Sequence, residues 1–99
     1  MTIDIIATFQ VDPRNLEPFE VVMAHVRPVM MEDPGCLRYD LQRAGKDSST
    51  YVLLERYSDR ESLQRHTGCE AFRGLEAQLR GLLTAAPEIQ VLRAVGEQV

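Results

Sequence analysis

Residues 50–57, TYVLLERY in one-letter code, carry the clearest structural signal in the chain, because they read as a strand with apolar side chains on both faces. One face carries Tyr51, Leu53 and Tyr57, and the other carries Val52 and Leu54. A strand with one face in water alternates apolar with polar residues, so this pattern predicts a strand that is covered on both faces. A single layer of helices covers only one of them. The economical cover for the other face is a second copy of the chain, which predicts a homodimer.

The segments just before this strand predict its hairpin partner. Residues 36–43 read as a second strand, and residues 44–49, AGKDSS, supply the glycine, aspartate and serines of a turn. The two strands are therefore predicted to form a hairpin with a longer loop. Asp33, Pro34 and Gly35 precede the hairpin and are expected to close a helix.

The N-terminal third predicts a strand followed by that helix. Residues 2–11 alternate, with Ile3, Ile5, Ala7, Phe9 and Val11 on one face. Residues 12–15 are turn formers, and Asn15 is a candidate N-cap. From Leu16 the apolar residues follow helical spacing: Leu16, Phe19, Val22, Met23, Val26 and Met30. Pro28 is expected to kink or fray the last turn of this helix.

The C-terminal half predicts two short helices and a last strand. Ser58 or Asp59 should cap the first helix, which carries Leu63 on its inner side and His66 near its end. Thr67 and Glu70 have the spacing of a capping box for the second helix. The apolar side of that helix carries Phe72, Leu75, Leu79, Leu82 and Leu83, and its outer side carries Arg73, Glu76 and Arg80. Residues 88–95 form the last strand, in which Ile89, Val91 and Val95 alternate with polar residues.

The resulting order is β-α-β-β-α-α-β, the split βαβ arrangement of the ferredoxin-like α+β class with one helix broken in two. This order predicts a four-stranded antiparallel sheet in a single domain, residues 1–99. A chain of this length buries only about 60–65% of its unfolded surface. Its own core is therefore modest, which again favours association with a partner subunit.

Composition narrows the function classes. Eleven Lys and Arg against fifteen Asp and Glu give a net charge of −4, which disfavours nucleic-acid binding. The first ten residues lack a basic segment and contain Asp4, so they do not resemble a signal peptide. No stretch is long and apolar enough to span a membrane. The two cysteines, Cys36 and Cys69, do not form a disulfide framework, and as reduced thiols they indicate a cytoplasmic protein.

Motifs for bound metals and cofactors are absent. The sequence has no glycine-rich nucleotide-binding loop, no CxxC and no HExxH. His66 and Cys69 are spaced to share a helical face, but a zinc site needs four ligands or three plus water. The other histidine, His25, lies on a different predicted helix. We therefore expect neither a metal nor a cofactor.

Three local sequences resemble the antibiotic biosynthesis monooxygenase (ABM) domain family. Residues 34–41, PGCLRYDL, look like that family's approach to its second strand, and residues 51–57, YVLLERY, resemble its third strand. His66 followed by Phe72 is similar to the family's junction between two short helices. The resemblance extends over essentially the whole chain. In two places the sequence departs from it: Ala71 occupies the position of a second histidine, and Tyr57 stands where tryptophan is frequent.

The resemblance implies a dimeric α+β barrel, in which each subunit packs its sheet against its own helices and against its partner's sheet. It also implies a cofactor-independent monooxygenase that oxidises a small aromatic, quinol or polyketide-type substrate with molecular oxygen. Two alternatives stay open. One is a small-molecule isomerase or signal-degrading enzyme of the same fold, and the other is a non-catalytic ligand-binding dimer. The absence of tryptophan disfavours a haem-degrading relative, and Ala71 in place of the second histidine removes one candidate acid/base residue, which favours the non-catalytic alternative.

His66 is the leading candidate for acid/base chemistry. A phenol or hydroquinone reacts with oxygen once it is deprotonated, which requires a base that titrates near neutral pH, as histidine does. The alternative is that His66 only caps the carbonyls at the end of its helix. Glu55 and Tyr51 are the candidates to orient this base. Glu55 is flanked by apolar residues and needs a partner if it is buried, and the alternative, which the pattern favours somewhat more, is a structural anchor at the dimer interface.

A further set of residues is predicted to line an apolar cleft between sheet and helices, suited to a flat aromatic ligand. The set consists of Tyr39, Tyr57, Phe72, Met23, Phe19 and His25. The alternative for the tyrosines is a place in the core or at the interface, and for His25 a place on the flank of its helix.

Overall fold

The computed structural model describes residues 1–96 and contains four strands and three α-helices in that part of the chain. In chain order these are β1 (Ile3–Gln10), the 3₁₀ turn η1 (Pro13–Asn15), α1 (Leu16–Met30), β2 (Cys36–Arg43), β3 (Thr50–Tyr57), α2 (Arg60–Gly68), α3 (Glu70–Leu79) and β4 (Glu88–Arg93). The order of elements is the predicted one. The expected domain, residues 1–99, includes three residues, 97–99, that lie outside the described part.

The strands form one antiparallel sheet in the order β2-β3-β1-β4. β3 pairs with β1 on one side and with β2 on the other, so Glu55 lies opposite Ile5 and Tyr39. β4 pairs with β1, which places the last strand at the edge of the sheet. This topology confirms the ferredoxin-like α+β fold.

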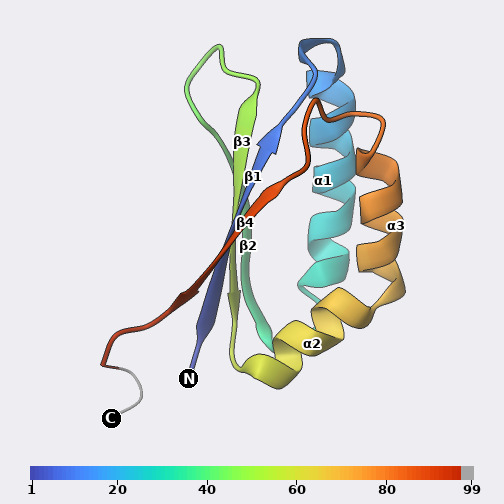
Figure 1. Cartoon of the computed structure of the whole chain (residues 1–99). Helices are drawn as coiled ribbons and strands as arrows, with labels where there is room; N and C mark the ends of the chain where they lie inside the picture. Colours follow the sequence, from blue (N-terminus) through green and yellow to red (C-terminus); the bar gives the residue numbers. More distant parts are fainter. Residues whose placement is uncertain (97–99) are drawn as a thin grey trace.

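All three helices lie on one face of the sheet (Figure 1). The side chains of β1 and β3 that point toward them are buried, and those that point away are partly exposed, with the exposed Arg56 near the end of β3. Phe19 and Tyr57 are fully buried in the core between sheet and helices, and Tyr51 is 2% exposed. The burial predicted for the face that carries Tyr51, Leu53 and Tyr57 is thus confirmed.

The opposite face of the sheet is left uncovered by this chain (Figure 1). Ile6, Val52 and Leu54 are only partly exposed there, because neighbouring strands shield them. β4 extends away from the helices (Figure 1), and all six of its residues are exposed. The expected burial of one face of β4 is therefore not seen in a single chain, where Ile89 and Val91 are 61% and 52% exposed.

Several local predictions need correction. Asn15 stands at the N-cap of α1 but makes no side-chain capping bond, because Asp12 caps the preceding 3₁₀ turn through the backbone N–H of Arg14. By contrast, α1 runs through Pro28 to Met30, the last residue of the predicted apolar stripe. The C-terminal strand ends at Arg93, so Val95 lies beyond it.

The junction of α2 and α3 also differs from the prediction. Thr67 is inside α2, and its hydroxyl donates to the backbone carbonyls of Leu63 and Gln64 instead of capping α3. The N-cap of α3 is Cys69, which makes no side-chain capping bond. α3 ends at Leu79, so Leu82 and Leu83 pack against the core from the following turn. The capping box was therefore wrong, although Asp59 caps α2 as expected.

Candidate functional site

A cavity of about 620 Å³ lies between the sheet and α3. We call it the His66 cavity. Strand residues Phe9, Tyr39, Leu53 and Glu55 line it together with His66 on α2, Phe72, Leu75 and Leu79 on α3, and residues 83–87. Its walls are mainly apolar, and its volume falls in the range of small-molecule sites.

Glu55 and His66 line this cavity, and Tyr57, which is not part of its lining, contacts both of them. The Tyr57 hydroxyl donates a hydrogen bond of 2.5 Å to Glu55 Oε1, and His66 Nε2 lies 3.5 Å from the same oxygen. Glu55 and His66 are 7% and 8% exposed. The His66 ring is enclosed by the aromatic rings of Tyr39, Tyr57 and Phe72 at centroid distances of 5.9, 5.0 and 5.1 Å.

Burial sets the charge of this cluster. It raises the pKa of Glu55 to about 7, although the hydrogen bond from Tyr57 acts in the opposite direction. It lowers the pKa of His66 to about 4, with a small opposing effect of Asp33. At neutral pH the imidazole is therefore uncharged and Glu55 is close to half ionised. The 3.5 Å contact is thus a carboxyl group beside a neutral imidazole, not an ion pair.

Local sequence explains how the two groups meet. Glu55 has the same parity on β3 as Tyr51, Leu53 and Tyr57, so the strand's alternation directs it toward the helices. Asp59 accepts a bond of 2.9 Å from the backbone N–H of Ser62 and starts α2, whose inner side carries His66 almost two turns later. Ser58 N–H donates to the Gly35 carbonyl and joins the beginnings of α2 and β2.

The structure brings together five of the residues that the sequence suggested: His66, Glu55, Tyr39, Tyr57 and Phe72. It places Tyr51 and Met23 at a different cavity, also of about 620 Å³, which we call the Tyr51 cavity. The Tyr51 hydroxyl donates to Glu20 there, and the Arg43 guanidinium lies over its ring.

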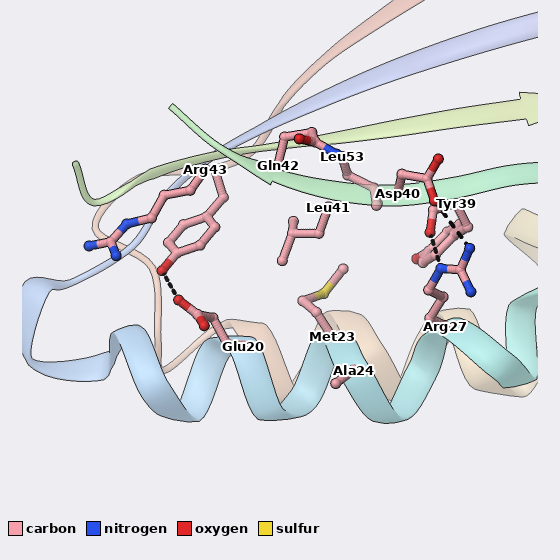
Figure 2. Close-up of a pocket in the computed structure, with 11 residues that line it drawn as sticks. Glu20, Met23, Ala24, Arg27, Tyr39, Asp40, Leu41, Gln42, Arg43 and Leu53 are labelled. Atoms are coloured by element: carbon pink, nitrogen blue, oxygen red, sulfur yellow. Dashed lines mark hydrogen bonds and ion pairs between the residues drawn. The ribbon is translucent and has the colours of Figure 1, made fainter. Parts of the chain in front are cut away.

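The Tyr51 cavity lies between α1 and the strands. Figure 2 shows Glu20, Met23 and Arg27 projecting from α1 toward the strands, with Met23 facing Leu41 on β2. Tyr39 and Leu53 line both of the large cavities and thus form part of the wall between them.

The remaining two predicted residues lie away from the cluster. Phe19 is fully buried and packs against the rings of Phe9 and Tyr51. His25 is on the exposed side of α1, where its ring nitrogen contacts the Val21 carbonyl at 3.0 Å.

The sequence reasoning missed two charged residues at this cavity. The sequence predicts Glu76 and Arg80 on the outer side of their helix. In the structure Glu76 lies on α3 and Arg80 directly follows that helix. Both side chains are exposed, and both line the His66 cavity. The sequence does contain an indication of this placement. Glu76 and Arg80 follow Phe72 at four-residue intervals, so the three residues lie on the same side of the helix. A tyrosine hydroxyl is among the partners that the sequence suggests for Glu55, and the structure identifies it as that of Tyr57.

The arrangement suits proton transfer to or from a bound organic molecule. A carboxyl group whose pKa lies near 7 is a base matched to neutral pH, and the apolar walls exclude water from it. Within residues 1–96, no cluster of three or more His, Cys, Asp or Glu side chains is arranged to hold a metal ion. None of the helices in this part of the chain has the length and apolar character needed to cross a membrane.

Comparison with known proteins identifies relatives of the chain. The family model for antibiotic biosynthesis monooxygenases matches residues 2–78. No curated protein sequence matches the chain significantly.

Several solved structures share the fold over nearly the full chain. A Caulobacter crescentus CB15 protein, provisionally described as an antibiotic biosynthesis monooxygenase, is 33% identical with a TM-score of 0.89, over 95% of this chain and 90% of that one. Rv0793 from Mycobacterium tuberculosis is 27% identical with a TM-score of 0.89, and both chains are covered completely. SnoaB from Streptomyces nogalater, a cofactor-independent oxygenase, is 26% identical with a TM-score of 0.78, over 94% of this chain and 92% of that one.

Proposed function

The chain belongs to the antibiotic biosynthesis monooxygenase family, and from this we propose that it is a cofactor-independent monooxygenase. Its substrate is a small aromatic, quinol or polyketide-type molecule, bound in the His66 cavity and oxidised by molecular oxygen. The observation that carries the proposal is the buried Glu55 carboxyl beside His66, in an apolar cavity of suitable volume. The cofactor-independent activity of SnoaB supports it.

In the proposed reaction, the first step is removal of a proton from the substrate's hydroxyl or activated carbon. The resulting anion is electron-rich enough to transfer an electron to oxygen, which a neutral phenol does far less readily. One oxygen atom then enters the substrate, and the other leaves as water with two hydrogens that the substrate loses. The substrate supplies all the electrons, so the balance requires no other reductant.

We assign the proton transfer to Glu55 and His66 acting as a pair. With a pKa of about 7, Glu55 is the stronger base of the two, whereas His66 has a pKa of about 4 and is neutral. His66 therefore positions the substrate's hydroxyl and passes its proton toward the carboxylate. Tyr57, instead of Tyr51, is the tyrosine that orients Glu55, because its hydroxyl donates directly to that carboxyl group.

The test measures oxygen consumption with a panel of quinols and anthrone-type phenols, corrected for autoxidation. We expect uptake by the wild-type protein and a decrease of about 10²–10⁴-fold in Glu55→Gln, the usual contribution of a positioned base. His66→Ala should also lose most of the activity. The matched control is His25→Ala, which removes an exposed histidine and should leave uptake unchanged.

Two outcomes would overturn the proposal. Wild-type protein that consumes no oxygen above the control, yet binds one of the phenols in the His66 cavity, would be a ligand-binding protein. Activity that survives both Glu55→Gln and His66→Ala would place the chemistry elsewhere.

We also propose that the protein works as a homodimer in which the uncovered faces of two sheets pack together. Ile6, Val52 and Leu54 are at the centre of that face, and they give it the apolar character that such an interface needs. Cys36 and Cys69 are free thiols in the structure, which accords with a reducing compartment such as the cytoplasm.

A further inference from the structure

A third cavity, of about 180 Å³, is also lined by His66. We call it the Cys69 cavity. Its apolar wall is formed by Val29 and Met30 at the end of α1, Cys36 on β2, and Cys69 and Ala71 at the start of α3. The His66 ring lines both this cavity and the His66 cavity, so the imidazole is part of the partition between them. Tyr57, which holds Glu55, lines the Cys69 cavity as well.

The interior of the Cys69 cavity carries little charge. Its charged residues, Asp33 and Arg65, pair with each other through contacts of 2.9 and 3.0 Å, and the Arg65 side chain is about half exposed. Burial raises the pKa of the Cys36 thiol and lowers that of His66, so both groups are uncharged at neutral pH. An ionic ligand would therefore find no unpaired charge to bind.

The size of the cavity limits its ligand to a small molecule. A volume of about 180 Å³ is well below that of typical sites for drug-sized ligands, about 300–1,000 Å³. Cavities of about 150 Å³ with apolar walls stay dry and take up xenon or benzene. The sulfur atoms of Met30, Cys36 and Cys69 add polarisable surface, which strengthens dispersion contacts with an apolar gas. Ala71 contributes only a methyl group to the wall and so leaves this space open.

We propose that the Cys69 cavity is a binding site for molecular oxygen, separate from the site of the organic substrate and adjoining it across the His66 ring. This inference rests on the proposed function, because that reaction needs oxygen close to a substrate that fills the larger cavity. Oxygen is small, uncharged and apolar, and it fits the Cys69 cavity, whereas a substrate of several rings needs the volume of the His66 cavity. The two reactants would then reach His66 from different cavities, and neither would have to displace the other.

The binding site is tested without turnover by NMR of the wild-type protein under xenon and under oxygen pressure. Xenon should shift the resonances of Ala71, Met30 and Cys69 in a saturable way, and paramagnetic oxygen should broaden the same resonances. Ala71→Leu adds three carbons to the wall and should abolish these effects at Met30 and Cys69. The matched control is Ala77→Leu, the same substitution at an exposed position of α3, which should retain them.

Kinetics then connects the cavity to the reaction. We expect Ala71→Leu to raise the KM for oxygen several-fold while the KM for the organic substrate stays within about twofold, and Ala77→Leu to change neither. Two results would overturn the oxygen site. One is that xenon has no saturable effect at Ala71, and the other is that the effect at Met30 and Cys69 survives Ala71→Leu. A wild-type protein that binds oxygen at these residues but consumes none would instead refute the proposed function.

Discussion

Glu55 is an unusual residue for the middle of a central strand, because an ionisable group is costly to bury. Its hydrogen bond from Tyr57 offsets only part of that cost, so the proton binds more tightly and the pKa rises to about 7. A glutamine would make the same bond without any charge. The carboxyl group therefore lowers the stability of the fold at neutral pH, as expected for a residue retained for chemistry.

This cost gives a prediction on stability. A group whose folded pKa lies above its unfolded value stabilises the fold at low pH and loses that contribution as pH rises. For Glu55 the window runs from about pH 4.5 to 7. Glu55→Gln should therefore gain about 3 kcal/mol relative to wild type between pH 4.5 and 8. Urea unfolding of both proteins at several pH values measures the difference.

The comparison between the two proteins isolates Glu55. His66, whose pKa is lowered to about 4, produces the opposite trend below pH 6.5, so the difference between pH 6.5 and 8 reports Glu55 most directly. Glu32→Gln, at an exposed position outside the helices and strands, serves as the control for the loss of one carboxyl group. A flat difference between Glu55→Gln and wild type over this pH range would contradict the raised pKa of Glu55.

Tyr57 gives a second prediction at this scale. Its hydroxyl holds the pKa of Glu55 below the value that burial alone would produce. Tyr57→Phe keeps the ring in the core but removes that bond, so the pKa of Glu55 should rise. If the carboxylate is the base, activity increases with pH, and the midpoint of that increase should move above pH 7. Oxygen uptake measured from pH 5 to 9 reports the midpoint, and a carbon-13 titration of the glutamate carboxyl reports the pKa without turnover.

Helix α2 holds His66 in place, and its position depends on a close approach to the start of β2. A Cβ atom added to Gly35 would lie 2.0 Å from Ser62 Oγ and 2.5 Å from its Cβ. Ser62 cannot move away freely, because its backbone N–H and its hydroxyl both bond to the capping Asp59. The contact between Gly35 and Ser62 therefore fixes how closely α2 packs on the sheet.

Gly35→Ala should accordingly destabilise the protein by about 1–3 kcal/mol, the usual cost of overpacking. It should also lower oxygen uptake, because α2 must shift and carry His66 away from Glu55. The matched control is Gly74→Ala in α3, where an added Cβ meets nothing within 4 Å. That substitution should instead stabilise by up to about 1 kcal/mol, since alanine is the better helix former. Thermal unfolding measures the stability of both variants. Equal changes in stability for Gly35→Ala and Gly74→Ala would contradict a steric role for Gly35.

Most elements could be predicted from the sequence because each has a local cause. The alternation of side chains predicts β1 and β3, the helical spacing of apolar residues predicts α1, and Asp59 as a capping residue predicts the start of α2. The capping box at Thr67 failed because its hydroxyl bonds back into its own helix, a competition that spacing alone does not resolve.

The site was predicted only in part, for a similar reason. Parity on β3 directs Tyr51 and Tyr57 to the same face, but strand twist and the helix opposite each residue decide which cavity it reaches. Tyr51 meets Glu20 of α1, whereas Tyr57 lies beside His66 of α2. Such long-range pairings depend on how whole elements pack, which residue type and spacing do not specify.

At the scale of the whole molecule, the short chain builds one sheet and one layer of helices, and this leaves one sheet face bare (Figure 1). That face has an apolar centre surrounded by paired charges, such as Asp4 with Arg56 and Arg38 with Asp40. Leu54 is at its middle, opposite Ile6 on β1 and Asp40 on β2. An apolar patch with a charged rim is typical of a protein interface, and a second copy of the sheet supplies a matching surface.

We therefore expect the wild-type protein to sediment at micromolar concentration with twice the mass of one 11.2 kDa chain. Leu54→Lys should shift it to a single-chain mass, because the substitution puts a charge at the centre of the interface without disturbing the helical face. Gln78→Lys adds the same charge at an exposed position of α3 and should leave the dimer intact. A wild-type protein of single-chain mass, or a Leu54→Lys variant that remains dimeric, would show that the bare face has another partner or none.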